Sequence, residues 1–303
     1  MTVGFAGLGR MGFAMARNVL GAGFPLIVFN RTASRATPLV DEGAAAVTSP
    51  TELGVCDIVV TMVSDGGGAW EILVDGGLLD ALRPGSVVLE MSTIGPTAAQ
   101  GLAGEAEQRG VQLLDAPVSG SVSVAEAGQL FAMVGGDGDA YKRAIPVLDA
   151  MTKGHAFLGR SGAGAAMKLA LNAMVAATNE SVAETIALAK RFGIDPETAY
   201  DVLSGGALAS PFLQYKRRAF LHPESEPAAF TAALMRKDLA LVDDLAKRLE
   251  VRMPVTAAAT HVLDEALASG LSDADMASVL RLLDSELTAT PGEAQAHDPR
   301  EEP

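Results

Sequence analysis

The stretch from Gly162 to Phe192 constrains the fold of this chain most strongly. After its two glycines it contains no further glycine or proline, and it is rich in alanine, leucine and methionine, which are strong helix formers. The pattern predicts one helix of about 28 residues, roughly 42 Å long at the usual rise per residue. Its first half is apolar on nearly every side, so we expect that half to be buried.

Two polar residues interrupt this apolar half. Lys168 is followed four residues later by Asn172, and residues spaced by four lie on the same face of a helix. An ammonium group inside an apolar helix is costly unless it faces a cleft or a partner. We therefore expect the pair to mark a functional site.

Composition excludes several classes of partner. The chain has 303 residues, a formal net charge of -14 and a sequence pI near 4.7. Such acidity argues against a nucleic-acid partner and against binding to an anionic membrane surface. The single cysteine, Cys56, excludes an internal disulfide and is expected to be a small buried residue. The four histidines lack metal-ligand spacing, so no metal site is predicted.

The N-terminus opens directly on a strand-like run and lacks the pattern of a secretory signal. The long helix could span a bilayer by length alone, but its polar residues argue against that. We expect a soluble, cytoplasmic protein.

Residues 1–161 alternate short β-branched runs with helical stretches, which is the rhythm of βαβ units. The fold class predicted is α/β, with an N-terminal Rossmann-like, doubly wound, mostly parallel sheet. The expected strands are VGFAG, LIVFN, DIVVTMV, SVVLE, VQLLD and LFAMVGG.

Residues 162–290 are predicted to form an all-helical domain for substrate binding and oligomerisation, joined to the first by the long helix. Further helices are expected near 195–204, 209–220, 228–249, 254–269 and 272–287. Asp195-Pro196 and Ser272-Asp273 are candidate N-terminal caps. Residues 291–303 lack apolar periodicity and are predicted to be disordered.

A GxGxxG motif follows the first predicted strand and opens a helical run. In a strand–turn–helix context this motif predicts dinucleotide binding, with the pyrophosphate at the helix N-terminus. The predicted cofactor-binding residues of the loop are Gly7, Leu8, Gly9, Arg10, Met11 and Gly12.

The second predicted strand ends in Asn30-Arg31-Thr32, where a carboxylate would bind the ribose 2′-hydroxyl of NAD. Guanidinium and hydroxyl groups instead suit a 2′-phosphate. NADP(H) is therefore the preferred cofactor and NAD(H) the second candidate. The alternative for Arg31 is a solvated loop cation.

Residues 115–121, DAPVSGS, follow a predicted strand. The hydroxyl and N–H groups of Ser119, Gly120 and Ser121 suit a substrate carboxylate. An ordinary strand-to-helix turn with serine caps explains them equally well.

The chain resembles the β-hydroxyacid dehydrogenase family, which includes 3-hydroxyisobutyrate dehydrogenase and glyoxylate/succinic semialdehyde reductase. The resemblance is carried by GFAGLGRMGFAMARNVLGAG, DAPVSGS, GAGAAMKLALN and Lys237-Asp238, in the family's order. It implies that Lys168 is the catalytic lysine, which exchanges a proton with the substrate oxygen, and that Asn172 holds the substrate.

The resemblance also implies further roles. Ser119 and Gly120 would hold a substrate carboxylate, and Thr93 would lie near nicotinamide and substrate. Lys237 would reach the cofactor. The remaining candidates are Ser121, Phe230 and Asp238 for the substrate, and Met62 and Val63 for the cofactor.

Two departures from the family pattern concern this site. Ser121 replaces a usual glycine. The loop after the fourth strand, which commonly reads MLP in the family, here lacks the proline and adds a carboxylate at Asp65. The function expected is hydride transfer between NADP(H) and a small carboxylate-bearing hydroxy acid, semialdehyde or 2-oxo acid, in a homodimer or homotetramer. The alternatives are an imine reductase-like enzyme, against which Lys168 counts, and a non-catalytic nucleotide-binding protein.

Overall fold

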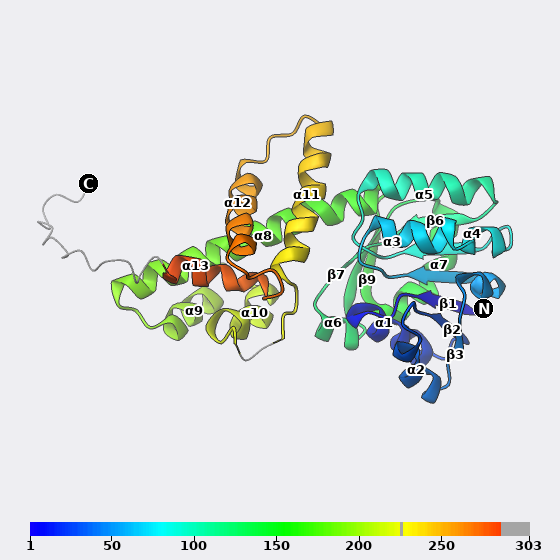
Figure 1. The fold of residues 1–303 in the computed structure, drawn as a ribbon, viewed down its shortest axis with the longest axis horizontal. Helices are drawn as coiled ribbons and strands as arrows, with labels where there is room; N and C mark the ends of the chain where they lie inside the picture. Colours follow the sequence, from blue (N-terminus) through cyan, green and yellow to red (C-terminus); the bar gives the residue numbers. More distant parts are fainter. Residues whose placement is uncertain (225–226, 286–303) are drawn as a thin grey trace, which may run out of the picture. The chain divides into compact units, whose positions relative to one another are not determined.

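The computed structural model describes residues 1–224 and 227–285, and the chain divides into two compact units. The first unit contains Met1–Ala173 and Asp238–Arg252, and the second contains the described residues within Met174–Lys237 and from Met253 onward. Figure 1 labels the helices of both units and several strands of the first.

The first unit is built on a six-stranded parallel sheet in the order β3-β2-β1-β4-β5-β6 (Figure 1). This is the strand order of dinucleotide-binding α/β folds. Strands β1, β4 and β5 are buried along their whole length, as expected for parallel strands covered on both faces. The strands are β1 (Val3–Ala6), β2 (Leu26–Phe29), β3 (Ala45–Val47), β4 (Ile58–Thr61), β5 (Val87–Glu90) and β6 (Gln112–Asp115).

Helices cover both faces of this sheet with separate apolar cores. Ile58 and Val60 of β4 join the core beneath α1, α2 and α7, whereas Val59 between them joins the core beneath η2, α3, η3, α4 and α5. The bounds are α1 (Arg10–Gly21), η1 (Ala33–Ala36), α2 (Thr37–Asp41), η2 (Pro50–Val55), α3 (Gly66–Trp70), η3 (Glu71–Asp75), α4 (Leu78–Ala81), α5 (Pro96–Gln108) and α7 (Gly138–Met151).

A second, three-stranded sheet follows, in the order β7-β8-β9. Its members are β7 (Val118–Ser119), β8 (Leu130–Val134) and β9 (Thr152–Phe157), with α6 (Val122–Glu126) between the first two. The predicted strand LFAMVGG is β8, paired antiparallel with β7 and parallel with β9. The doubly wound, mostly parallel fold class is confirmed.

The long helix α8 spans Ala163–Phe192, so the predicted single helix is confirmed. Its first half is not buried on all sides, however, because Met167 is 44% and Met174 69% exposed. Ala165 belongs to the apolar core beside α5, so one face is covered while another remains accessible. The compact units divide within α8, between Ala173 and Met174, rather than at its start.

The second unit is helical. It contains the end of α8, α9 (Pro196–Gly205), α10 (Pro211–Leu221), the start of α11 (Ala232–Arg248), α12 (Pro254–Ala268), η4 (Met276–Val279) and α13 (Leu280–Ser285). The Asp195 cap is confirmed, since its carboxylate accepts the N–H of Thr198 at 3.0 Å. The cap predicted at Ser272-Asp273 is wrong, because Asp275 caps η4 instead, through the N–H of Ala277 at 3.0 Å.

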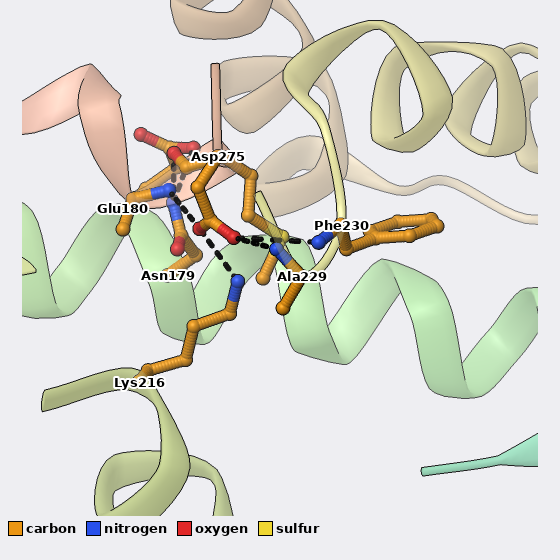
Figure 2. A network of polar contacts seen from close by, with 8 residues as sticks. Asn179, Glu180, Lys216, Ala229, Phe230 and Asp275 are labelled. Carbon is orange, nitrogen blue, oxygen red and sulfur yellow. Dashed lines mark hydrogen bonds and ion pairs between the residues drawn. The ribbon is translucent and has the colours of Figure 1, made fainter. Parts of the chain in front are cut away.

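A buried ion pair organises this unit (Figure 2). The ammonium of Lys216 donates to Asp275 Oδ1 at 2.6 Å, and both side chains are almost fully buried. Asp275 Oδ2 accepts the N–H groups of Ala229 at 2.9 Å and Phe230 at 3.3 Å. The pair therefore fixes the backbone that leads into α11.

Among the helices within residues 1–224 and 227–285, none combines the length and apolar character that crossing a membrane requires. The predicted disordered tail, residues 291–303, lies outside the described residues, as does the end of the helix predicted to reach residue 287.

Candidate active site

The loop between β1 and α1 requires glycine at two of its three motif positions. Gly7 has a φ of +101°, and a Cβ there would lie 2.2 Å from the carbonyl oxygen of Met62. A Cβ on Gly12 would lie 2.0 Å from the carbonyl oxygen of Gly7. At Gly9, the N-cap of α1, an added Cβ would meet nothing within 4 Å. The backbone is thus open where the helix begins, which fits the approach of a pyrophosphate.

Asn30 ties this loop to the end of β2. Its Oδ1 accepts the N–H of Leu8 at 2.8 Å, and its Nδ2 donates to the carbonyl of Thr32 at 2.9 Å. The predicted cofactor residue Asn30 therefore has a structural task in shaping the phosphate loop. Arg31 and Thr32 are exposed, and Arg31 lies 3.8 Å from Glu71 with 88% of its side chain accessible.

Three polar residues end neighbouring strands at the carboxyl edge of the sheet. Thr61, Glu90 and Asp115 lie in register at the ends of β4, β5 and β6, and all three are fully buried. The hydroxyl of Thr61 donates to Glu90 Oε2. Burial raises the pKa of Glu90, although its hydrogen bonds with Ser92 and Thr61 oppose that rise.

The row formed by Thr61, Glu90 and Asp115 supports two segments that carry predicted site residues. Ser92 donates its N–H to Glu90 Oε1 at 2.9 Å, and its hydroxyl accepts the N–H of Val63 at 2.8 Å. These bonds hold Val63 next to the segment that carries the half-buried Thr93, and Met62 donates its N–H to the carbonyl of Ala6 at the end of β1. Glu90 is not among the site residues predicted from the sequence, although a carboxylate that ends a buried apolar strand is an unusual feature that could have identified it.

The turn after β6 contains one constrained glycine and one capping serine. Gly120 has a φ of +142°, and a Cβ there would lie 2.7 Å from Leu130 and 2.8 Å from Val124. The hydroxyl of Ser121 accepts the N–H of Val124 at 3.4 Å and caps α6. Ser121 is therefore a helix cap, as the alternative interpretation of this turn expects. Ser119 is half-buried and Gly120 is exposed, and both precede the cap.

The predicted helix pair lies within the same unit as the glycine loop and this turn. Lys168 is half-buried on α8, and Asn172 is only 4% exposed. Asn172 donates through Nδ2 to Asp238 Oδ2 at 2.6 Å, which fixes the orientation of its amide. Phe230 and Lys237, by contrast, belong to the second unit.

Other residues singled out in the sequence have structural roles. Asp65 caps α3 by accepting the N–H of Gly68 at 2.9 Å, which accounts for the carboxylate after the fourth strand. Cys56 is buried, and burial raises the pKa of its thiol to about 11, so it is not a nucleophile near neutral pH. Within the described part of the chain, no group of three or more His, Cys, Asp or Glu residues could hold a metal ion.

Comparisons with known proteins agree with this architecture. Residues 2–162 match the NAD binding domain of 6-phosphogluconate dehydrogenase, and residues 162–283 match the NAD-binding domain of NADP-dependent 3-hydroxyisobutyrate dehydrogenase. Both matches meet at the start of α8.

Glyoxylate/succinic semialdehyde reductase 1 of Arabidopsis thaliana is 35% identical over 92% of this chain and 97% of its own length. The 3-hydroxyisobutyrate dehydrogenase structure from Salmonella typhimurium is 31% identical, with a TM-score of 0.86, over 93% of this chain and 99% of that one. The Mycobacterium tuberculosis 3-hydroxyisobutyrate dehydrogenase with L-serine is 31% identical, with a TM-score of 0.80, over 93% and 98%. The chain therefore belongs to the family of NAD(P)-dependent β-hydroxyacid dehydrogenases.

Proposed function

We propose that the protein transfers a hydride between NADP(H) and a small substrate that carries a carboxylate, either a semialdehyde, a 2-oxo acid or the corresponding hydroxy acid. The observation that carries the proposal is the half-buried residue Lys168, placed on α8 in the same compact unit as the glycine loop and the turn after β6. The named substrates of the family relatives support the substrate class.

Proton transfer is the task proposed for Lys168. Reduction of a carbonyl develops negative charge on its oxygen, which needs an acid close by. A lysine ammonium donates that proton near neutral pH, and its neutral amine accepts the proton in the oxidation direction. The nicotinamide cofactor, when bound, supplies or accepts the hydride.

Substrate orientation is the task proposed for the surrounding groups. Asn172, whose amide is fixed by Asp238, holds the reacting end of the substrate. Ser119 and Gly120 bind its carboxylate through hydroxyl and N–H groups, and Thr93 contacts the substrate near the nicotinamide. Ser121 contributes through its hydroxyl, which can donate while accepting the cap bond.

Preference for NADP(H) over NAD(H) is the finer part of the proposal. Asn30 stands where NAD enzymes of this fold place a carboxylate, and it is already bonded to the glycine loop. The exposed Arg31 and Thr32 supply a guanidinium and a hydroxyl for a 2′-phosphate. Self-association into a dimer or tetramer is also proposed, and light scattering tests it.

The substrate class is tested by NADPH oxidation with glyoxylate, succinic semialdehyde, tartronate semialdehyde and methylmalonate semialdehyde. We expect turnover of at least one. Butanal, in which a methyl group replaces the carboxylate of succinic semialdehyde, is the matched control and should react far more slowly. Cyclic imine reduction without aldehyde reduction would favour the imine reductase alternative. Absence of any reaction, with NADPH still binding, would favour the non-catalytic one.

A further inference from the structure

We propose that Asp115 is a positioning residue that holds the start of α8 against the end of β6, and thereby places the Lys168 amine relative to the turn that binds the substrate carboxylate. The inference rests on the function proposed above for Lys168 and for the turn after β6. It assigns to the first residue of DAPVSGS a task distinct from contact with the substrate.

The contacts of Asp115 join two segments far apart in sequence. Its Oδ1 accepts the N–H of Gly162 at 2.7 Å, and its Oδ2 accepts the N–H of Ala165 at 2.8 Å. The residue is fully buried. Both carboxylate oxygens are therefore used to satisfy N–H groups at the start of α8, which lack partners within the helix. A carboxylate there also interacts favourably with the helix dipole.

Glycines allow this close approach. A Cβ on Gly164 would lie 2.2 Å from the carbonyl oxygen of Met133 and 2.6 Å from that of Asp115. A Cβ on Gly135 would lie 2.8 Å from Asp115 Oδ1. Gly162, with a φ of +86°, reverses the chain into the helix. Little space remains for the helix start to shift, so its position relative to β6 is strongly defined.

Asp115 stands at the junction of two parts of the proposed site. It is the last residue of β6, and after Ala116 and Pro117 the chain enters β7, which ends at Ser119 just before Gly120. On the other side, α8 runs without interruption from Ala163 to Lys168, a rise of roughly 8 Å at the usual helical pitch. A displacement of the helix start would therefore move the amine relative to the carboxylate-binding turn.

Burial of this carboxylate is itself costly. Desolvation raises the pKa of Asp115, while the N–H groups of Ala165 and Gly162 lower it. An apolar strand end with a serine or threonine cap would avoid that cost. A task in positioning α8 explains why a fully buried carboxylate stands here.

The test compares Asp115→Asn with Asp137→Asn. In Asp115→Asn, an NH2 group replaces one carboxylate oxygen and faces an N–H group of the helix start. One of the two cap bonds is therefore lost. Asp137 is the comparison because it also caps a helix, α7, but it is exposed and accepts the N–H groups of Asp139 at 3.0 Å and Ala140 at 2.8 Å through Oδ1 alone. Turnover, the KM for NADPH and the melting temperature are measured for both.

We expect Asp115→Asn to lower kcat roughly 10- to 100-fold, because small misplacements of a reacting group have such effects. The KM for NADPH should change by less than about twofold, and Asp137→Asn should keep kcat within about twofold. A folded Asp115→Asn protein with normal kcat, or equal losses of kcat in both variants, would overturn the inference.

Asp115→Ser, which brings no amide toward the helix, is the second variant if Asp115→Asn does not fold. Failure of both to fold while Asp137→Asn folds would make Asp115 a folding residue and would also overturn the inference. If the unmodified protein were inactive on the whole substrate panel, that result would contradict the proposed function. It would not contradict the hydrogen bonds by which Asp115 caps α8.

Discussion

Arg31 offers a direct residue-level test of cofactor choice. Arg31→Asp places a carboxylate where the 2′-phosphate of NADPH is proposed to bind, and the carboxylate would instead accept a hydrogen bond from the ribose of NADH. We expect the ratio of kcat/KM for NADPH to that for NADH to fall by at least about tenfold, the equivalent of one charge-assisted hydrogen bond. Steady-state kinetics with both cofactors measures this ratio.

Arg252→Asp is the control for this test, since it changes one exposed arginine outside the cofactor loop. It should leave the ratio unaltered. An unchanged ratio in Arg31→Asp would show that Arg31 is a solvated loop cation, in keeping with its weak contact to Glu71 at 3.8 Å.

Residue roles were predictable where their cause is local. Gly7 and Gly12 follow from the motif because the turn itself requires them. The cap of α3 by Asp65 was not recognised, because capping depends on where the next helix begins. The role of Asp115 depends on Gly162 and Ala165, which are distant in sequence, and no spacing rule connects them.

Buried polar contacts between elements can contribute to the stability of the fold. Lys216 of α10 and Asp275 before η4 form the ion pair that fixes the approach to α11 (Figure 2). Lys216→Met keeps an unbranched side chain that is one heavy atom shorter, but leaves the Asp275 carboxylate buried without its cation. We expect a loss of about 3–5 kcal/mol in the free energy of unfolding, the usual effect of removing one partner of a buried pair. Denaturant unfolding measures it.

Lys247→Met is the comparison variant, because Lys247 pairs with Asp243 on the exposed face of α11, with both side chains largely accessible. Exposed pairs of this kind contribute little, so its unfolding midpoint should stay close to that of the parent. If Lys216→Met behaved like Lys247→Met, the buried pair would not organise the second unit.

Elements were predictable where an apolar run is long enough to show its period. All six predicted strands form, whereas β3, β7 and β9 were missed because they are short or carry polar and half-buried residues. The helix expected from residue 272 begins at Met276 instead. Its start is displaced because Asp275 is engaged with Lys216 and with backbone N–H groups before α11, a tertiary contact that overrides the local cap pattern.

Stability of the whole molecule should depend on the protonation of Glu180. This residue of α8 is 8% exposed, and burial raises its pKa to about 7 from an ordinary value of 4.5, with Glu184 adding to the rise and Asn179 opposing it. Because the folded state holds this proton more tightly, the contribution to stability is present below pH 4.5 and is lost as pH rises through 7.

Melting temperatures between about pH 5 and pH 8 test this dependence. The parent should lose stability across the interval by more than Glu180→Gln, which cannot ionise. Glu107→Gln, at an exposed glutamate, should behave like the parent. Identical pH dependence in the parent and in Glu180→Gln would show that the carboxyl is already ionised at no cost.

At the scale of the whole chain, the sequence predicts a division at Gly162, because strand-like runs cease there. The family matches also meet at residue 162. The compact units divide later, within α8, and they place Asp238–Arg252 with the sheet. Sequence periodicity could not indicate this, because a helix that continues from one packed unit into another has the same local pattern throughout.

The central claim is that the amine of Lys168 exchanges the substrate proton, and Lys168→Ala tests it most directly. With the best substrate of the panel, kcat should fall roughly 10³-fold or more, as for loss of a general acid, while the Kd for NADPH stays near that of the parent. Lys153→Ala, at an exposed lysine of β9, should retain full turnover. Near-normal kcat in Lys168→Ala would contradict the account.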